Sequence, residues 1–341
     1  MRPLRFALFG CGFWSTYQLA AWRELKGAVC VAVCDRNFSS AEALGRRFGI
    51  EGIYDDPETL LAREKLDFVD IVTDVASHAP LARLAARHGL AVICQKPMAA
   101  TLREAEDLVA FCRKHRAPFF VHENFRWQAP IRALKAELDR GKVGRVFRAR
   151  IDFISGFPVF TNQPGLAKLE QFIVADLGSH MLDLARFLFG EADSIYCRTQ
   201  RVHPKINGED VATILITTRA GAHISINMAY AGNALEREAF PETQVFVEGT
   251  AGSAELAPGC VLRTTTTQGT QVRRALPPFY SWADPRYAVV HSSIVPCNAN
   301  LLAALQRRGR AETTGEDNLH TVRLVFGAYT SAARVRPVRI S

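Results

Sequence analysis

Short runs of consecutive apolar residues alternate with helical patterns over the first 120 residues of this 341-residue chain. Several of these runs lack polar alternation, as expected of strands that are buried on both faces of a sheet. Regular alternation of strand and helix predicts βαβ units, and hence a parallel sheet with right-handed crossovers. The predicted strands are Leu4–Phe9, Val29–Cys34, Phe68–Val72, Ala91–Cys94 and Pro118–His122, and the predicted helices are Trp14–Leu25, Ser39–Phe48, Ala79–His88 and Leu102–His115.

The pattern changes after about residue 123, where longer runs with alternating polar and apolar residues begin. Such runs predict a large, open, mostly antiparallel sheet that has one face to be covered. The predicted strands are Arg145–Phe153, Asp193–Arg201, Val211–Thr218, Ala222–Ala229, Thr243–Glu248, Val261–Thr266 and Thr270–Arg274, with helices at Ile131–Asp139, Ala175–Phe189, Cys297–Arg307 and Asp317–Ala333. We therefore expect an α/β chain with a doubly wound parallel sheet in residues 1–123 and an α+β domain in residues 124–341.

The first predicted strand runs directly into the segment GCGFWS, residues 10–15. Gly10 and Gly12 permit a tight turn and the close approach of a pyrophosphate to the N-terminus of the next helix. Ser15 replaces a third glycine, at a position that needs only a small residue. Asp35 ends the second strand, where a carboxylate can accept hydrogen bonds from an adenosine ribose. The alternative is a chance glycine turn with an exposed aspartate. The context favours a dinucleotide-binding Rossmann domain.

The two residues at the end of the second strand point to different cofactors. The carboxylate of Asp35 would repel a 2′-phosphate and favours NAD, whereas the guanidinium of Arg36 could bind that phosphate. We expect NAD, with NADP as the alternative.

Two further motifs carry groups suited to chemistry. Lys96, one of only eight lysines, follows a predicted strand at the edge where ligands bind in such sheets. Asp176 and His180 are four residues apart on a predicted helix and so share one face. An acid and an imidazole so placed can bind a hydroxyl and take its proton. The alternatives are a solvated Lys96, an Asp176 that caps the helix and a His180 that packs in the core.

Together these motifs resemble the glucose–fructose oxidoreductase/inositol dehydrogenase (Gfo/Idh/MocA) family over nearly the whole chain. The resemblance includes Thr73 and His78, in the loop that approaches nicotinamide in that family, and the segment NFRW at residues 124–127. Two positions depart from the family pattern. Asp74 stands where the family usually has Pro, and Gln95 stands where Glu usually precedes the Lys-Pro pair.

The resemblance implies an NAD(P)-dependent oxidoreductase that acts on CH–OH groups. It implies that His180 takes the substrate hydroxyl proton, Lys96 polarises that oxygen and Asp176 orients the substrate. It also implies a homodimer or homotetramer formed through the open sheet. The residues expected at the cofactor are Gly10, Gly12, Phe13, Trp14, Asp35, Arg36, Thr73, His78, Gln95 and Lys96.

Within the family, residues 95–99, 122–128 and 154–160 look most like the D-apiose dehydrogenase branch, which implies oxidation of apiose to a lactone. The alternatives are an inositol dehydrogenase or another sugar or polyol dehydrogenase, a redox-neutral glycosidase that uses transient oxidation, and a non-catalytic nucleotide-binding sensor. The candidate substrate residues have polar and aromatic groups that suit a polyhydroxylated ring. They are Glu123, Asn124, Arg126, Trp127 and Asn162. Any of them could instead be structural, and Trp127 could belong to the core of the domain interface.

Composition excludes several other classes. The net charge of 42 − 34 = +8 comes from scattered basic residues without a stripe of interleaved aromatics, so we expect no nucleic-acid partner. No run approaches about 18 consecutive apolar residues, so we expect no membrane span. The eight cysteines form no CxxC pair and no zinc-like spacing, which predicts no metal site and favours a reducing cytoplasm. The apolar run after Arg5 is too short to predict a signal peptide.

Overall fold

The computed structural model describes residues 2–157, 159–232, 234–236 and 238–340. The chain folds into two compact units. The first unit ends at Asn124 but also takes in two later segments, and the second unit contains the rest. The later segments of the first unit are Tyr280–Ala283 and His291–His320.

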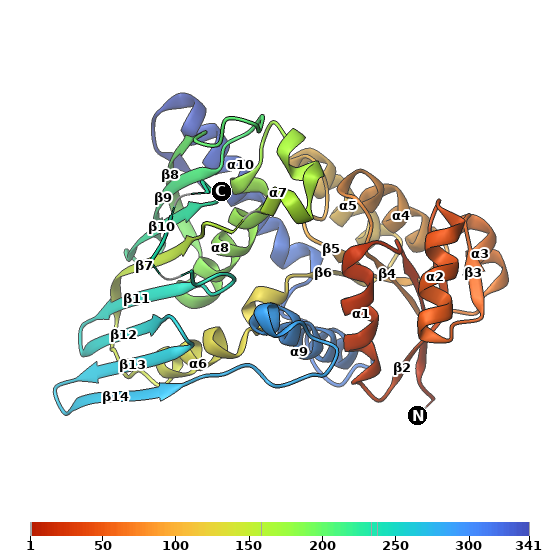
Figure 1. Ribbon diagram of the computed structural model, residues 1–341, viewed down its shortest axis with the longest axis horizontal. Coiled ribbons are helices and arrows are strands. Elements are labelled where there is room, and N and C mark those ends of the chain that lie inside the picture. Colours follow the sequence, from red (N-terminus) through yellow and green to blue (C-terminus); the bar gives the residue numbers. More distant parts are fainter. Residues whose placement is uncertain (1, 158, 233, 237, 341) are drawn as a thin grey trace. The chain divides into compact units, whose positions relative to one another are not determined.

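The first unit contains a six-stranded parallel sheet of order β3-β2-β1-β4-β5-β6 (Figure 1). Its order reverses between β1 and β4, which leaves a crevice at the carboxyl ends of these two strands. The doubly wound Rossmann sheet is thus confirmed, and the unpredicted β3 and α3 are too short for their periodicity to be recognised. The elements are β1 (Leu4–Phe9), α1 (Phe13–Arg23), β2 (Ala28–Cys34), α2 (Phe38–Phe48), β3 (Gly52–Tyr54), α3 (Pro57–Arg63), β4 (Phe68–Ile71), α4 (Val75–Arg87), β5 (Ala91–Gln95), α5 (Leu102–Lys114) and β6 (Phe119–His122).

Aromatic packing joins the central strands of this sheet to the first helix. Phe6 of β1 and Phe68 of β4 stack with their ring centroids 4.8 Å apart, and both are fully buried. Trp22 of α1 lies against both rings. Burial of these large rings stabilises the β1–α1–β4 unit, and therefore the crevice, by several kcal/mol, on the order of 2 kcal/mol for each side chain.

The second unit contains a nine-stranded sheet of order β14-β13-β12-β11-β7-β10-β9-β8-β15 (Figure 1). The pair β7–β10 is parallel and the other described pairs are antiparallel, so the predicted open, mostly antiparallel sheet is confirmed. The short strands β12 and β15 were not predicted. The elements are α6 (Ala129–Asp139), β7 (Val146–Ile154), α7 (Val159–Asn162), α8 (Ile173–Phe189), β8 (Ala192–Gln200), β9 (Val211–Thr218), β10 (His223–Ala229), β11 (Gln244–Gly249), β12 (Gly252–Ala257), β13 (Val261–Thr266), β14 (Gly269–Arg274) and β15 (Val338–Arg339).

Helix α8 covers the inner face of this sheet. Along β9, Ala212, Ile214 and Ile216 are buried while Leu215 between them is exposed, as period-two alternation predicts. The buried set joins the apolar residues of α8 in one continuous core. Because α8 is apolar over most of its circumference, it is held firmly, and so are the polar residues that it carries.

Two late helices, α9 (Ala288–Leu305) and α10 (Gly315–Arg334), close the chain. Helix α9 begins well before the predicted start at Cys297, because its buried polar residues 291–293 interrupt the apolar pattern from which a helix is recognised. Ile294 and Val295 pack against Ala21 of α1. Residues 291–320, expected in the second domain, therefore belong to the first unit. Periodicity shows that a helix has a buried face but not which sheet buries it.

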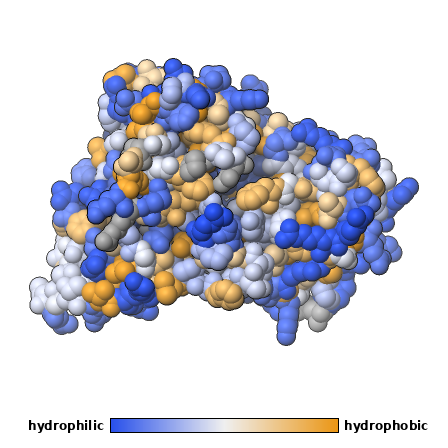
Figure 2. Space-filling view, viewed as in Figure 1, coloured by the Kyte–Doolittle hydropathy of each residue, from blue (hydrophilic) through white to orange (hydrophobic). Residues whose placement is uncertain are grey.

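Helix α9, with the turn before it, is long and apolar enough to cross a membrane by length and composition. This segment comprises the 21 residues Pro285–Leu305, and 56% of its most apolar stretch is buried within the structure. The core helix of a soluble protein can be equally long and apolar. Ile294 and Leu301 are fully buried. On the face drawn in Figure 2, hydrophilic and apolar residues are interspersed. The burial favours a core helix.

Candidate active site

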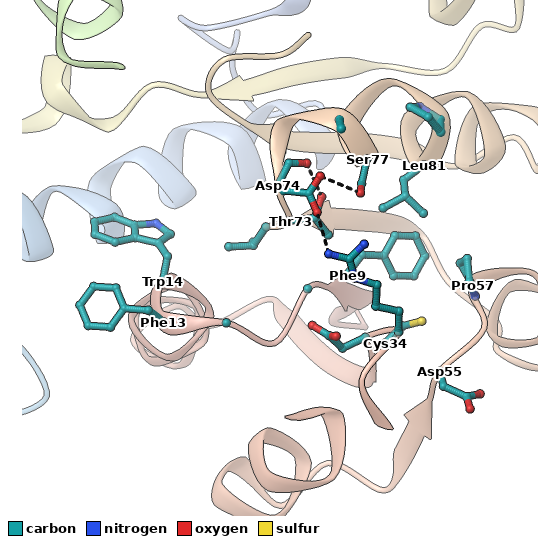
Figure 3. Close-up of a pocket in the computed structure, with 17 residues that line it drawn as sticks. Phe9, Phe13, Trp14, Cys34, Asp55, Pro57, Thr73, Asp74, Ser77 and Leu81 are labelled. Carbon is teal, nitrogen blue, oxygen red and sulfur yellow. Dashed lines mark hydrogen bonds and ion pairs between the residues drawn. The ribbon is translucent and has the colours of Figure 1, made fainter. Parts of the chain in front are cut away.

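A cavity of about 590 Å³ opens at the carboxyl ends of β1, β2 and β4 in the first unit. Figure 3 shows Phe13 and Trp14 at one end of this cavity and Asp55 and Pro57 at the other. The crevice that the strand order leaves is therefore an open, elongated space, as a dinucleotide requires. Seven of the residues expected at the cofactor line it, namely Gly10, Gly12, Phe13, Trp14, Asp35, Arg36 and Thr73.

The glycine turn fits a pyrophosphate. Gly10 has a φ of +93°, and a Cβ atom there would lie 2.4 Å from the carbonyl oxygen of Val72. The hydroxyl of Ser15 donates to the carbonyl of Gly10 at 2.7 Å, which holds the turn against the helix. At Gly12, the N-cap residue of α1, the place of a Cβ atom is open space. The absent side chain leaves the helix N-terminus accessible to an anion.

Asp35 is held by backbone groups on both sides. Its Oδ2 accepts from the N–H of Cys11 at 2.7 Å, and its Oδ1 accepts from the N–H of Asn37 at 2.9 Å. A carboxylate offers about four lone-pair positions. Two of them therefore stay available for the hydroxyls of a ribose, and the carboxylate is already oriented.

The charges around the cavity disfavour an additional phosphate. Arg36 pairs with Asp74 at 3.6 Å, although its side chain is 88% exposed. Asp74 also accepts from the hydroxyl of Ser77, as Figure 3 shows. With Asp35 and Asp55, the lining contains three carboxylates and one guanidinium. Asp74, at the position where the family usually has Pro, thus competes with any 2′-phosphate for Arg36.

His78 lies beside the cavity rather than in its lining. It is 2% exposed, and its ring nitrogens lie 3.1 Å from the carbonyl oxygen of Thr73 and 2.8 Å from that of Pro97. Burial lowers the pKa of His78 and favours the neutral ring, which donates a single hydrogen bond. This places His78 between the Thr73 loop and the segment that follows Lys96. The geometry favours a supporting role over the cofactor contact that was expected.

Gln95, the residue before Lys96, belongs to a buried polar chain. Its Nε2 donates to Oε1 of Gln18 at 3.4 Å, and Nε2 of Gln18 donates to Asp70 at 2.8 Å. Nε1 of Trp22 donates to the same Asp70 oxygen at 2.7 Å. A glutamate, which the family usually has at position 95, would have no N–H to donate to Oε1 of Gln18. The glutamine found here therefore suits the hydrogen-bonding groups around it.

Asp70 gives this chain a pH-dependent stability. Burial raises its pKa to about 6, well above the usual value of an aspartate, so the folded state binds a proton more readily than the unfolded state. Lowering the pH from 8 to 5 should therefore raise the free energy of unfolding of the wild type relative to Asp70→Asn by about 1 kcal/mol. Urea titrations at both pH values measure this difference, and the exposed Asp107→Asn variant on α5 is the control. An equal response of wild type and Asp70→Asn would contradict it.

Helix α8, in the second unit, carries two of the predicted catalytic residues. Asp176 lies in the first turn and His180 one turn further, so the predicted helix and shared face are present. His180 is 7% exposed, and its ring stacks on Phe125 with centroids 3.8 Å apart and planes inclined by 4°. The stack fixes the plane of the imidazole. Lys96, the third predicted catalytic residue, belongs to the first unit and directly follows β5.

Arg126 has a structural partner. Its Nε and Nη2 donate to the carboxylate of Asp183 at 2.5 and 2.7 Å, and both residues are buried. Thr321 donates to the same carboxylate at 2.9 Å. This bidentate pair ties the segment before α6 to α8 and favours a supporting role for Arg126 over the expected contact with substrate. The guanidinium of Arg132 covers the ring of Trp127 at 3.5 Å.

The other candidate substrate residues are distributed over both units. Glu123 is fully buried in the first unit, and Nδ2 of Asn124 donates to the hydroxyl of Ser293 at 2.8 Å. The side chain of Asn162 lies outside the part of the chain that is described. No sequence signal had connected Asn124 to Ser293, which is 169 positions away.

Sequence reasoning missed an aromatic cluster in the second unit. Phe157 and Phe240 stack with centroids 4.2 Å apart, and Tyr287 meets Phe240 edge-on at 5.6 Å. The pKa of Tyr230 is well above its ordinary value because of burial and then of the charge on Asp176. These rings come from separate segments, so only the aromatic composition of the loops could have signalled them. Such rings suit the C–H face of a sugar.

The described residues contain no group of three or more His, Cys, Asp or Glu side chains that could hold a metal ion. All eight cysteines are free thiols.

Comparisons with known proteins agree with this geometry. Residues 4–123 match the oxidoreductase family with an NAD-binding Rossmann fold, and residues 131–255 match the GFO/IDH/MocA C-terminal domain. The D-apiose dehydrogenases of Rhizobium rhizogenes and Paraburkholderia graminis are each 44% identical over 340 residues, which span 100% of this chain and 98% and 90% of those proteins.

A solved structure shows the same fold at similar identity. It is that of an oxidoreductase from Agrobacterium radiobacter in complex with NAD+, L-tartaric acid and magnesium. It is 44% identical, has a TM-score of 0.97, and the match covers 99% of this chain and 98% of that one. The expected family and the expected cofactor are confirmed, and the chain belongs to the GFO/IDH/MocA family of oxidoreductases as an NAD-dependent member.

Proposed function

We propose that this protein oxidises the anomeric hydroxyl of D-apiose to give apionolactone. The observation that carries the proposal is the 44% identity to D-apiose dehydrogenases over the whole length of the chain. The reaction balances as apiose plus NAD+ to lactone, NADH and one proton. The anomeric carbon gives up its hydrogen as a hydride, and its hydroxyl gives up a proton.

The cavity residues hold the cofactor in this proposal. The open side of Gly12 and the N-terminus of α1 accommodate the pyrophosphate, and Asp35 accepts the ribose hydroxyls. NAD+, when bound, supplies the acceptor for the hydride, which is chemistry that the protein itself lacks. Phe13, Trp14 and Thr73 line the rest of the cavity.

Three side chains handle the substrate hydroxyl. His180 accepts the hydroxyl proton, because an imidazole titrates near neutral pH and its plane is fixed by Phe125. Lys96 donates a hydrogen bond to the same oxygen and stabilises the negative charge that develops on it. Asp176 accepts from a neighbouring hydroxyl and so orients the ring.

The remaining sugar contacts are assigned by chemistry. Glu123, Asn124 and Asn162 offer hydrogen bonds to hydroxyls, and Trp127 offers a ring face. To these we add Phe157 and its aromatic neighbours, because their ring faces suit the C–H side of a pentose.

Steady-state kinetics with a panel of substrates tests the proposal. With apiose, xylose, glucose, myo-inositol and a sugar phosphate at saturating NAD, apiose should have the highest kcat/KM. A kcat/KM for inositol or the sugar phosphate at least tenfold above every free aldose would reject an aldose substrate. Activity on aldoses but not on apiose would reject only the choice of sugar. Failure to reduce NAD with any of them would favour a nucleotide-binding sensor.

We also propose that the chain forms a homodimer or homotetramer in the cytoplasm. On the outer face of the second sheet, Ile154 and Leu215 are 43% and 46% exposed among charged and polar neighbours. Apolar side chains on a sheet face without covering helices suit contact with a second copy. Sedimentation analysis of the purified protein measures the oligomeric state, and a monomer at micromolar concentration would contradict the proposal.

A further inference from the structure

Helix α8 lacks a capping side chain of its own. Its N-cap residue is Phe172, which offers no acceptor to the first N–H groups of the helix. The helix nevertheless carries Asp176 in this first turn. What satisfies these N–H groups therefore decides how firmly Asp176 is held.

Two residues from distant parts of the second unit supply the missing acceptors. Oε1 of Glu209, in the loop before β9, accepts from the N–H groups of Phe172 and Val174, each at 3.2 Å. The backbone carbonyl of Glu209 accepts from the N–H of Ile173 at 3.1 Å. The hydroxyl of Tyr329, on α10, accepts from the N–H of Ala175 at 3.0 Å.

The two capping groups are themselves joined. The hydroxyl of Tyr329 donates to Oε1 of Glu209 at 2.7 Å, so one hydrogen bond links the acceptors at the helix start. Burial and then the charge on Glu209 raise the pKa of Tyr329, which keeps this donor protonated. The negative charge of Glu209 also faces the positive end of the helix dipole.

A neighbouring contact holds the loop that carries Glu209. The N–H of Asn207 donates to the carbonyl of Ala167 at 3.0 Å, and its side-chain amide donates to Glu170 at 3.0 Å. The residues that lead into α8 and the loop before β9 are thus bound to each other. The first turn of α8 is fixed from two sides.

We propose that Glu209 and Tyr329 are positioning residues, which hold the first turn of α8 so that Asp176 meets the substrate. The inference rests on the proposed function for the role of Asp176, while the capping itself concerns this chain alone. A displaced catalytic turn lowers turnover more than cofactor affinity, because small errors in orientation raise the barrier of the chemical step.

The test compares Tyr329→Phe with Ser331→Ala in the full-length protein. Ser331 lies on the same helix, and its hydroxyl also accepts from a backbone N–H, that of Cys197 at 3.0 Å. Both variants lose one such bond, but only Tyr329→Phe loses it at the start of α8. Glu209→Ala and Glu209→Gln form a second pair, because Gln retains an amide oxygen as acceptor.

Amide hydrogen exchange and steady-state kinetics are the two measurements. In Tyr329→Phe, amides 173–176 should exchange about 5- to 30-fold faster, the usual range for a lost cap, while Ser331→Ala leaves them unchanged. The kcat with apiose should fall about tenfold with the KM for NAD unchanged. Glu209→Ala should behave in the same way, and Glu209→Gln should restore most of the kcat.

The outcomes distinguish the capping role, the positioning role and the proposed function. Unchanged exchange at 173–176 would overturn the capping role, and faster exchange with an unaltered kcat would overturn the positioning role. A wild type that oxidises no sugar would reject the proposed function, while hydrogen exchange would still decide whether the pair holds the turn.

Discussion

Lys96→Met and His180→Ala should each lower turnover of the sugar by about 10²- to 10⁴-fold, the usual scale for a group that moves or stabilises a proton in the transition state. Lys96→Met removes the cation that we propose stabilises the developing oxyanion, and His180→Ala removes the proposed acceptor of the hydroxyl proton. Binding of NAD should persist in both variants, because neither residue lies in the glycine turn. Fluorescence titration with NADH and single-turnover kinetics separate the two effects.

A matched variant tests whether a loss at His180 reflects chemistry or packing. His115, the C-cap residue of α5, stacks on Phe111 with centroids 4.0 Å apart, much as His180 stacks on Phe125 at 3.8 Å. His115→Ala should therefore lose a similar ring contact and keep its turnover. Near-normal turnover in both Lys96→Met and His180→Ala would refute the catalytic assignment.

Asp35→Ala should raise the Kd for NAD by about 10- to 100-fold, because hydrogen bonds to a charged acceptor contribute about 1.5–3 kcal/mol. NADP should lose much less, since the substitution also removes a charge that repels the 2′-phosphate. The ratio of kcat/KM for NAD to that for NADP should fall at least tenfold. Part of the loss of NAD affinity comes from the turn itself, as Asp35 also accepts from the N–H of Cys11.

Asp74→Asn separates charge from hydrogen bonding in this experiment. It removes one carboxylate from the same cavity and releases Arg36 from its ion pair. Exposed ion pairs contribute little, so the ratio should move only a few fold toward NADP. A wild type that binds NADP tightly and NAD hardly at all would show that Asp35 and Arg36 have been assigned the wrong roles.

The cofactor-binding residues could be predicted from the sequence because they lie in short motifs at the ends of consecutive predicted strands. Gly10 and Gly12 follow a strand and open a helix within a few residues, and Asp35 directly follows the next strand. The i, i+4 spacing likewise placed Asp176 and His180 on one face of α8. In each case the signal is a short motif within one element or two consecutive strands, so it can be recognised without knowledge of contacts with distant segments.

The hydrogen-bond partners of other motif residues could not be predicted, because these partners come from distant segments of the chain. Arg126 was expected at the substrate, yet Asp183 binds it 57 positions away. His78 was expected at the cofactor, yet it lies between the backbone carbonyls of Thr73 and Pro97. The sequence pattern around a polar residue is the same whether its side chain contacts a ligand or a buried partner in the protein.

By itself, the sequence determined the two kinds of sheet, the glycine turn with Asp35, and the helix that carries Asp176 and His180. Apolar periodicity and turn residues act over a few positions, and they specify which face of an element is buried. Only the tertiary structure decided what covers each face: that α9 packs on α1, that the buried Asp70 accepts hydrogen bonds from Trp22 and Gln18, and that Glu209 and Tyr329 cap α8. Burial makes such distant polar partners obligatory, but periodicity does not say which residues they are.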